Sequence, residues 1–396
     1  MKIQHRALLA IVLTSLNLRT CIVALAPLVP RISHDLGIGS GVVGILGMIP
    51  TIAFALTAFI LPQLTRRFTI SQLLMWAMVF TALGQLWRVL GPSTFNLMAG
   101  TAIALLAIGI TNAAMPIAVR QLFPNHVSSL STTYLVTAQL GMGASPLLAD
   151  PIAKAAESAS LAGWQISLGS WAVLGVLGAL AWLPLLGRGK REKTATVEEQ
   201  KMPVWTTSLG VGLGVMFGFT SFVTYAGMAF IPQVFVEAGA SAGFGGLMLG
   251  YWSMMGLIVN VVGPWTVARF SNPFPAVLIA AALFITGNVG MLTAPMSAPW
   301  LWVTLSSLGP LTFPMALTLI NIRASTIEGA TALSSFGQGL GYTLASFGPL
   351  LSGFVREATG GWTAVLAIWV ASTVFMAIGG FFATRPVTIE QKLRLE

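Results

Sequence analysis

The sequence predicts an all-α membrane protein in which twelve transmembrane helices form two bundles of six. Three observations support this fold class: the composition, a series of apolar runs of membrane length, and an internal repeat. Hydrophobic residues make up 56% of the 396 residues and charged residues only 8%. A soluble domain carries about a quarter charged residues, so this chain lacks the polar groups that a water-exposed surface needs.

The apolar runs set the number of helices. A helix needs about 20 mainly apolar residues to cross a bilayer. The runs that meet this length are 7–30, 41–63, 70–90, 95–119, 129–150, 164–187, 204–230, 242–266, 274–294, 300–322, 330–353 and 362–384. The first run starts like a signal peptide, but it continues past Arg19, and an arginine stands where a cleavage site has small residues. We therefore expect it to be a retained span.

The basic residues predict the orientation. The only long polar stretch is the central linker, and placing it in the cytoplasm with both termini puts fifteen of the twenty Lys and Arg residues inside. We expect an N-terminal bundle (1–187), a cytoplasmic linker (188–203) and a C-terminal bundle (204–396). The net charge of +9 lies in short connectors, which indicates topology signals rather than nucleic-acid binding. The expected location is the bacterial cytoplasmic (inner) membrane.

The two halves of the chain repeat each other. "PRISHDLG" from Pro30 corresponds to "PQVFVEAG" from Pro232, and "PQLTRRF" from Pro62 corresponds to "PWTVARF" from Pro264, all at an offset of 202 residues. Weaker matches continue at offsets of 198 or 199. Because six spans separate the copies, both halves have the same orientation, which is the pattern of parallel-repeat transporters.

Arg19 is the main candidate for chemistry, since it lies near the middle of the first span. An arginine at mid-span costs about 2.5 to 3.5 kcal/mol even on the lower scales, and all eleven acids fall in connectors or at span ends. Arg19 either binds backbone carbonyls freed near Pro27 or Pro50, or it is a fixed cation for an anionic substrate. We favour the second, because a guanidinium suits bidentate anion recognition.

Further polar residues in the spans are candidates for lining a substrate cavity. They are Asn17, Asn112, Tyr134, Gln139, Tyr225, Tyr251, Gln338 and Tyr342. For Asn17, Asn112 and the two glutamines, bonding between spans is the alternative. Arg88 ends the third span, where we expect it to extend to the interface.

Five segments of the sequence resemble a known family. "LNLRTCIVALAPLVPRI", "WRVLGPS", "MPIAVRQLFP", "IPQVFVEAGAS" and "GQGLGYTLASFGPLLSG" are similar to counterparts in the cyanate/nitroimidazole transporter branch of the major facilitator superfamily. The resemblance implies that the loop after the second span acts as a conformational switch, with Arg66 and Arg67 here and Arg269 in the second copy. This loop lacks the acid that the family usually has, so its latch cannot be assumed.

The expected function is secondary transport of a small anionic or polar solute, such as a cyanate-like anion or a small nitro-aromatic, by alternating access. Efflux of small organic drugs is the rival reading. A channel is disfavoured because no filter segment or charge ring repeats, and an enzyme because the spans lack deep acids and histidines. One cysteine and three scattered histidines predict no metal and no cofactor. The expected partners are the substrate and the lipid bilayer, without nucleic acid, and the protein is expected to be a monomer.

Overall fold

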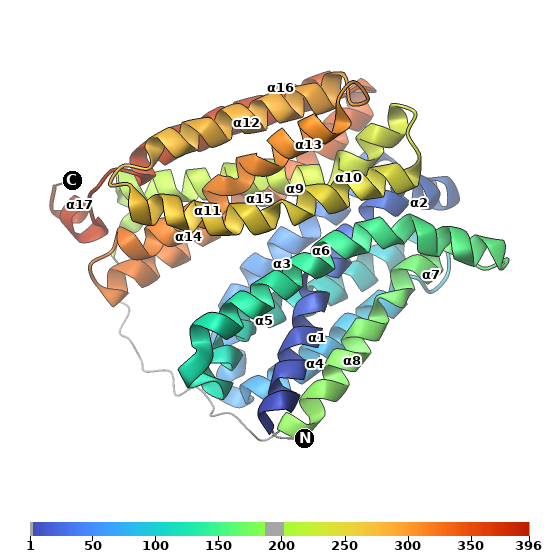
Figure 1. The fold of residues 1–396 in the computed structure, drawn as a ribbon, viewed down its shortest axis with the longest axis horizontal. Helices are drawn as coiled ribbons and strands as arrows, with labels where there is room; N and C mark the ends of the chain where they lie inside the picture. Colours follow the sequence, from blue (N-terminus) through green and yellow to red (C-terminus); the bar gives the residue numbers. More distant parts are fainter. Residues whose placement is uncertain (1–2, 187–201, 396) are drawn as a thin grey trace. The chain divides into compact units, whose positions relative to one another are not determined.

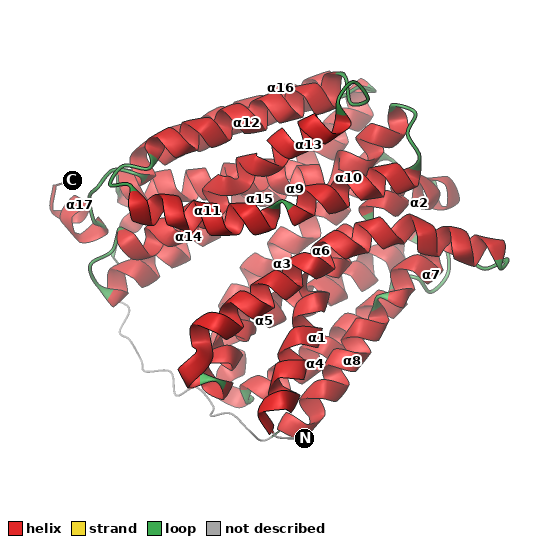
Figure 2. Cartoon of the chain, in the orientation of Figure 1, coloured by secondary structure: helices red, strands yellow, loops and turns green. Residues whose placement is uncertain are grey.

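The computed structural model describes residues 3–186 and 202–395, and within them every regular element is a helix (Figure 2). The first half contains α1 (Ile3–Val23), η1 (Ala26–Leu28), α2 (Val29–Leu36), α3 (Ser40–Arg67), α4 (Ile70–Trp87), α5 (Thr94–Leu122), η2 (Pro124–His126), α6 (Val127–Ser158), α7 (Gly163–Ser170), α8 (Ala172–Trp182) and η3 (Leu183–Leu185). The second half contains η4 (Val204–Thr206), α9 (Ser208–Glu237), α10 (Ala242–Met254), α11 (Gly256–Arg269), α12 (Phe274–Thr293), α13 (Pro299–Leu308), η5 (Gly309–Leu311), α14 (Thr312–Ile322), α15 (Ile327–Thr359), α16 (Thr363–Ala383) and α17 (Ile389–Leu395).

All twelve predicted spans coincide with helices, which confirms the all-α membrane fold class. Four of the spans are interrupted, as where α1 gives way to η1 and α2 just before Pro27. Among the described residues, ten helical stretches are long and apolar enough to cross a membrane. The two spans outside that group are α6 and α15, which the repeat pairs with each other. Both are rich in Ser, Thr and Gly, so their lower hydropathy is a shared feature of the two halves.

The internal repeat is visible in the backbone. Gly37 ends α2 in a left-handed conformation with φ of 63°, and Gly239 follows α9 with φ of 92°. A residue with a Cβ is strained at these angles, and these glycines are 202 positions apart. The same offset separates the last residues of α3 and α11, Arg67 and Arg269. The sequence repeat therefore corresponds to a repeat of helix ends.

The chain divides into two compact units by its internal contacts. The first comprises residues 1–39, 52–195 and 231–254, and the second comprises residues 40–51, 196–230 and 255–396. Two segments are therefore exchanged, since the start of α3 packs in the second unit and the end of α9 with α10 packs in the first. The bundle boundaries that we predict at 187/188 and 203/204 stay a prediction, because the linker falls mainly outside the described residues.

Each unit has its own apolar core. In the first unit α1 packs against α5, α6 and α8 (Figure 1), and α4 packs against α5 and α8. Its core includes Ile11, Leu74, Met115 and Trp182, all fully buried. In the second unit α12 packs against α13 and α16, and α11 against α14. Burial of these apolar faces between helices fixes the rotation of each helix and therefore the direction of its polar side chains.

Candidate functional site

One side of α1 is tied to α4 by polar side chains. Asn17 is fully buried, and its side-chain oxygen accepts hydrogen bonds from Gln85 of α4 at 3.3 Å and from Thr20 at 3.1 Å. The Asn17 amide lies 3.8 Å from the Met78 sulfur. Asn17 thus bonds between spans, as one of the two alternatives predicts, and these bonds hold α1 at a defined rotation. A contact of Asn17 with substrate stays a prediction.

Arg88 reinforces the same contact, and the expectation that it reaches the interface is wrong. Its side chain is completely buried, where it donates to the Cys21 carbonyl and sulfur at 3.4 Å and to the Leu168 carbonyl of α7 at 3.3 Å. The guanidinium replaces hydration with carbonyl acceptors from two neighbouring helices. An arginine at the end of a span can either extend to the interface or be buried between helices, and the sequence alone does not distinguish the two.

Arg19 points away from this contact. A helix turns by about 100° per residue, so Arg19 lies roughly opposite the side that Asn17, Thr20 and Cys21 share. Its side chain is partly buried. Among residues 3–186 and 202–395 it has no hydrogen-bonding or ion-pairing partner, and the guanidinium acts electrostatically on the Tyr134 hydroxyl of α6. A partly accessible cation without a counter-ion is the arrangement that an anion site requires.

The other predicted residues of the first unit differ in whether their polar side chains form hydrogen bonds to the protein. Asn112 of α5 is partly buried, and within the described part of the chain nothing bonds to its side chain. Gln139 of α6 donates to the Ser253 carbonyl of α10 and to the Met142 sulfur, so its amide is engaged between helices. Tyr251 of α10 is partly buried. Arg19, Tyr134 and Asn112, on three helices that pack together, are therefore the best candidates in this unit.

Three predicted residues belong to the second unit. Tyr225 of α9 is buried. Gln338 of α15 donates to the Ser334 hydroxyl at 2.7 Å, and the Tyr342 ring packs edge-on against Phe217 at 5.2 Å. Gln338 and Gln139 are related by the repeat, yet one bonds within its own helix and the other to a neighbouring helix. These three residues stay predictions for a substrate site.

The arginines of the predicted switch loop lie at helix ends. Arg66 and Arg67 are in the last turn of α3 and Arg269 is the last residue of α11, and all three are exposed. Positive charges at this position complement the negative end of the helix dipole. Nothing in this geometry tests the switching role that the family resemblance implies.

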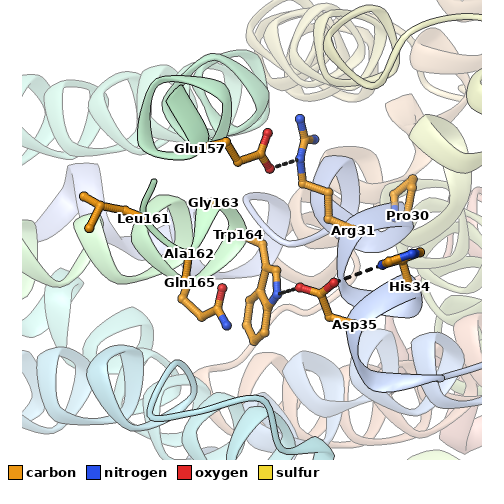
Figure 3. Close-up of a pocket in the computed structure, with 10 residues that line it drawn as sticks. All are labelled: Pro30, Arg31, His34, Asp35, Glu157, Leu161, Ala162, Gly163, Trp164 and Gln165. Carbon is orange, nitrogen blue, oxygen red and sulfur yellow. Dashed lines mark hydrogen bonds and ion pairs between the residues drawn. The ribbon is translucent and has the colours of Figure 1, made fainter. Parts of the chain in front are cut away.

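A groove at the end predicted to face outside is lined by two ion pairs, Arg31–Glu157 and His34–Asp35 (Figure 3). Its volume is about 570 Å³, and it lies between α2, the end of α6 and the start of α7. Arg31 bridges Asp150 at 2.7 Å and Glu157 at 2.8 Å. On the other wall Asp35 accepts hydrogen bonds from the Trp164 indole at 2.8 Å and from His34 at 3.1 Å.

Sequence reasoning missed this cluster. It placed Asp150 and Glu157 with the other acids in connectors or at span ends, but it could not pair side chains that are 126 positions apart in the chain, as Arg31 and Glu157 are. One signal for the cluster is present in the sequence: Asp150, Lys154 and Glu157 lie within two helical turns of one another at the end of the fifth span. Among the described residues, no group of three His, Cys, Asp or Glu side chains has the arrangement of a metal site.

Comparison with known proteins agrees with the fold. The family model described as "Major Facilitator Superfamily" matches residues 7–346. The chain is 26% identical to the uncharacterized transporter YycB of Bacillus subtilis (strain 168) over 95% of this chain and 92% of that protein. It is 27% identical to the 2-nitroimidazole transporter of Escherichia coli (strain K12), over 95% and 94% of the two chains. It is 25% identical to the cyanate transport protein CynX of the same organism, over 89% and 90%.

A solved structure is similar over nearly the whole chain. The crystal structure of a bacterial homolog to the human lysosomal transporter Spinster, in an inward-facing and occupied conformation, aligns with a TM-score of 0.78 at 15% identity. The alignment covers 95% of each chain. At this identity the likeness concerns the fold alone.

Proposed function

This chain belongs to the Major Facilitator Superfamily, and from that premise we propose that it carries a small anionic solute across the bacterial inner membrane, with Arg19 as the counter-charge. The family and its relatives are transporters. Transport by alternating access requires a site that each side of the membrane reaches in turn. In our proposal the substrate's negative group binds at Arg19.

The observation that carries the proposal is the unpaired guanidinium of Arg19. A permanent charge at mid-span is costly unless a partner or water stabilises it, and the described residues supply neither an acid nor an acceptor for it. Asn17 on the same helix bonds to Gln85 of α4, so Arg19 differs from this residue in having no protein partner. The Tyr134 hydroxyl is near enough for the charge of Arg19 to act on it, and it can donate a hydrogen bond to an anion. The Asn112 amide, on the neighbouring helix α5, is a further candidate donor.

The relatives narrow the substrate class. One is named as a cyanate transport protein and another as a 2-nitroimidazole transporter. Cyanate is a small linear anion, and a nitro group presents two partly negative oxygens to a guanidinium. The paired oxygens of a nitro group match the two-pronged geometry of a guanidinium, whereas cyanate contributes a full negative charge. We therefore extend the proposal to cyanate-like anions first and small nitro-aromatics second.

The test is ligand-dependent thermal stability of the purified protein. A ligand that binds the folded state raises its stability by mass action, so sodium cyanate should raise the melting temperature above the value in sodium chloride of equal ionic strength. Arg19→Gln should remove this shift and should fold normally. Arg120→Gln is the control, because it removes an exposed arginine from the same unit.

Each other outcome has a definite meaning. If Arg19→Gln retains the cyanate shift, Arg19 is structural and the anion proposal fails. If 2-nitroimidazole stabilises wild type and Arg19→Gln equally while cyanate has no effect, the protein is a carrier of small organic compounds of the efflux type.

A further inference from the structure

A second groove follows the line along which α12 packs against α16 in the second unit (Figure 1). Its volume is about 640 Å³. From α12 it is lined by Phe274, Leu278, Ala281, Ala282 and Ile285, which have the spacing of a single helix face. Because the two alanines are short, they leave a hollow between the larger side chains on either side of them.

The surface of this α12/α16 groove is apolar. The lining residues from α16 are Thr373, Val374, Ala377, Ile378, Phe381 and Phe382. The hydroxyl of Thr373 is buried and donates to the Trp369 carbonyl of its own helix at 2.8 Å, so it needs no further partner. Leu278 and Ile378, on the two walls, are 49% and 48% exposed. In a membrane-spanning helix pair, such a surface contacts either lipid or another apolar helix.

The length of the groove favours lipid. On α12 the groove runs from the first residue, Phe274, to Ile285, which is about 16 Å at the rise of an α-helix. The hydrocarbon core of a bilayer is about 30 Å thick, so the groove extends through one leaflet, starting at the end of α12 that is predicted to face the cytoplasm. A helix of a second copy would cross both leaflets, whereas an acyl chain occupies only one.

An arginine lies at the cytoplasmic end of the groove. The guanidinium carbon of Arg385 is 4.6 Å from the centre of the Phe381 ring and 5.4 Å from the centre of the Phe382 ring. Both rings line the groove, and their faces attract the cation without using its N–H donors. Arg385 is exposed, and among the residues that the structure describes no acid forms an ion pair with it. A cation therefore stands where the headgroup of a lipid in the groove would lie.

The helix ends beside Arg385 are held in place by Arg323. Its Nη2 donates to the Thr384 carbonyl, directly after α16, at 2.7 Å and to the Ser271 carbonyl, in the connection before α12, at 3.3 Å. The next acid along the chain, Glu390, already accepts hydrogen bonds from the connection between α14 and α15. The groove thus has a fixed cytoplasmic end at which positive charge is in excess.

We propose that the α12/α16 groove binds one anionic phospholipid of the cytoplasmic leaflet, with an acyl chain along the two helices and the phosphate at Arg385. A guanidinium is well suited to phosphate oxygens, and basic sites between transmembrane helices on the cytoplasmic side bind anionic headgroups. A zwitterionic lipid brings an ammonium group that the surrounding cations repel. The proposal depends on the membrane location of the chain but not on Arg19 or on the transported solute.

The experiment is native mass spectrometry of the full chain in detergent micelles, titrated with dioleoylphosphatidylglycerol or with dioleoylphosphatidylcholine. Wild type should bind one phosphatidylglycerol about tenfold more tightly than phosphatidylcholine, because a hydrogen bond to a charged group contributes roughly this factor or more. Arg385→Gln should weaken phosphatidylglycerol binding by about the same factor and so remove the preference. Arg120→Gln is the matched control, since it removes an exposed arginine that is also predicted to face the cytoplasm.

A second pair of variants tests the acyl chain. Ala282→Phe fills the groove without changing the charge, and it should fold because Ala282 is exposed. It should weaken the binding of both lipids. Ile279→Phe is its control, because Ile279 is 59% exposed on the same helix and lies outside the groove.

Three results would overturn the proposal. Equal affinity of wild type for the two lipids, unchanged in Arg385→Gln, would make the groove part of the general lipid-facing surface. Normal phosphatidylglycerol binding by Ala282→Phe, or displacement of the lipid by an equal concentration of glycerol 3-phosphate, would mean that Arg385 binds a phosphate without a chain in the groove. A dimer of wild type that Ala282→Phe converts to a monomer would assign the groove to a second copy of the chain.

Discussion

Gln85 of α4 donates a hydrogen bond to the side-chain oxygen of Asn17 on α1, with both residues fully buried and 3.3 Å between the bonding atoms. This bond and those of Arg88 set the rotation of α1. Because Arg19 lies two residues beyond Asn17, it is turned about 200° away from α4. The structural side of α1 therefore determines where its charged side points.

The first prediction separates the two asparagines. Asn17→Ala leaves the Gln85 amide unpaired in the core and should destabilise the protein by about 1 to 3 kcal/mol. Asn112→Ala should change stability little, because its side chain has no partner among the described residues, and should weaken cyanate binding. Chemical denaturation without ligand measures the first effect, and the cyanate-induced melting shift measures the second. Equal destabilisation by both substitutions would contradict this assignment.

The number of helices was predictable because each span must satisfy its backbone internally and cover about 20 residues with apolar side chains. The left-handed backbone at Gly37 and Gly239 also has a signal in the sequence. A glycine that recurs after a helix in both halves indicates a backbone angle that other residues rarely adopt. Both are local properties of the chain. They depend on hydropathy and on φ, which neighbouring residues largely determine.

The candidate site was predictable only in part. Arg19 stood out because charge at mid-span is costly wherever the helix packs. Asn17 and Gln139 carry the same polar groups as a ligand site would. Only the tertiary structure, which brings Gln85 of α4 to Asn17 and packs α6 on α10, shows that these groups bond to protein. The Arg31–Asp150 pair depends on α2 and α6 meeting at one end of the bundle. Contacts of that kind follow from tertiary structure and leave no local pattern.

A second prediction concerns the crossing of α4 and α5. A Cβ added at Gly84 would lie 2.5 Å from the Ala104 backbone nitrogen, so the two helices must separate to admit it. Gly84→Ala should destabilise the protein by about 1 to 3 kcal/mol, as overpacking does. Gly339→Ala meets no neighbour and should be neutral or slightly stabilising, since alanine favours a helix over glycine. Denaturant titration of both variants gives the comparison.

A third prediction tests the geometry at Arg19. Arg19→Lys keeps the charge but loses the two-pronged donor set, so it should weaken anion binding by about 1.5 to 3 kcal/mol if one charge-assisted hydrogen bond is lost. Tyr134→Phe should weaken binding by about 1 kcal/mol and fold normally, because the ring packs against the core of the first unit. Isothermal titration with sodium cyanate measures both. Full affinity in Arg19→Lys would mean that charge alone matters at this site.

The last prediction concerns pH and the C-terminal helix. The Glu390 carboxylate of α17 accepts hydrogen bonds from the Ser325 and Thr326 amides at 3.0 Å and from the Thr326 hydroxyl at 2.8 Å, which ties α17 to the connection between α14 and α15. Burial would raise the pKa of Glu390, but these hydrogen bonds outweigh it and lower the pKa from 4.5 to about 2. A lowered pKa means that the folded state favours the charged form. The stabilisation is therefore complete above about pH 4.5 and is lost as the pH falls toward 2.

Glu390→Gln should consequently melt below wild type at pH 7, and the difference should shrink steadily between pH 4.5 and pH 3. Glu328→Gln, which removes an exposed carboxylate from the first turn of α15, reports the effect of charge loss near the same loop. A gap between wild type and Glu390→Gln that stays constant from pH 7 to pH 3 would show that the Glu390 carboxylate does not anchor α17.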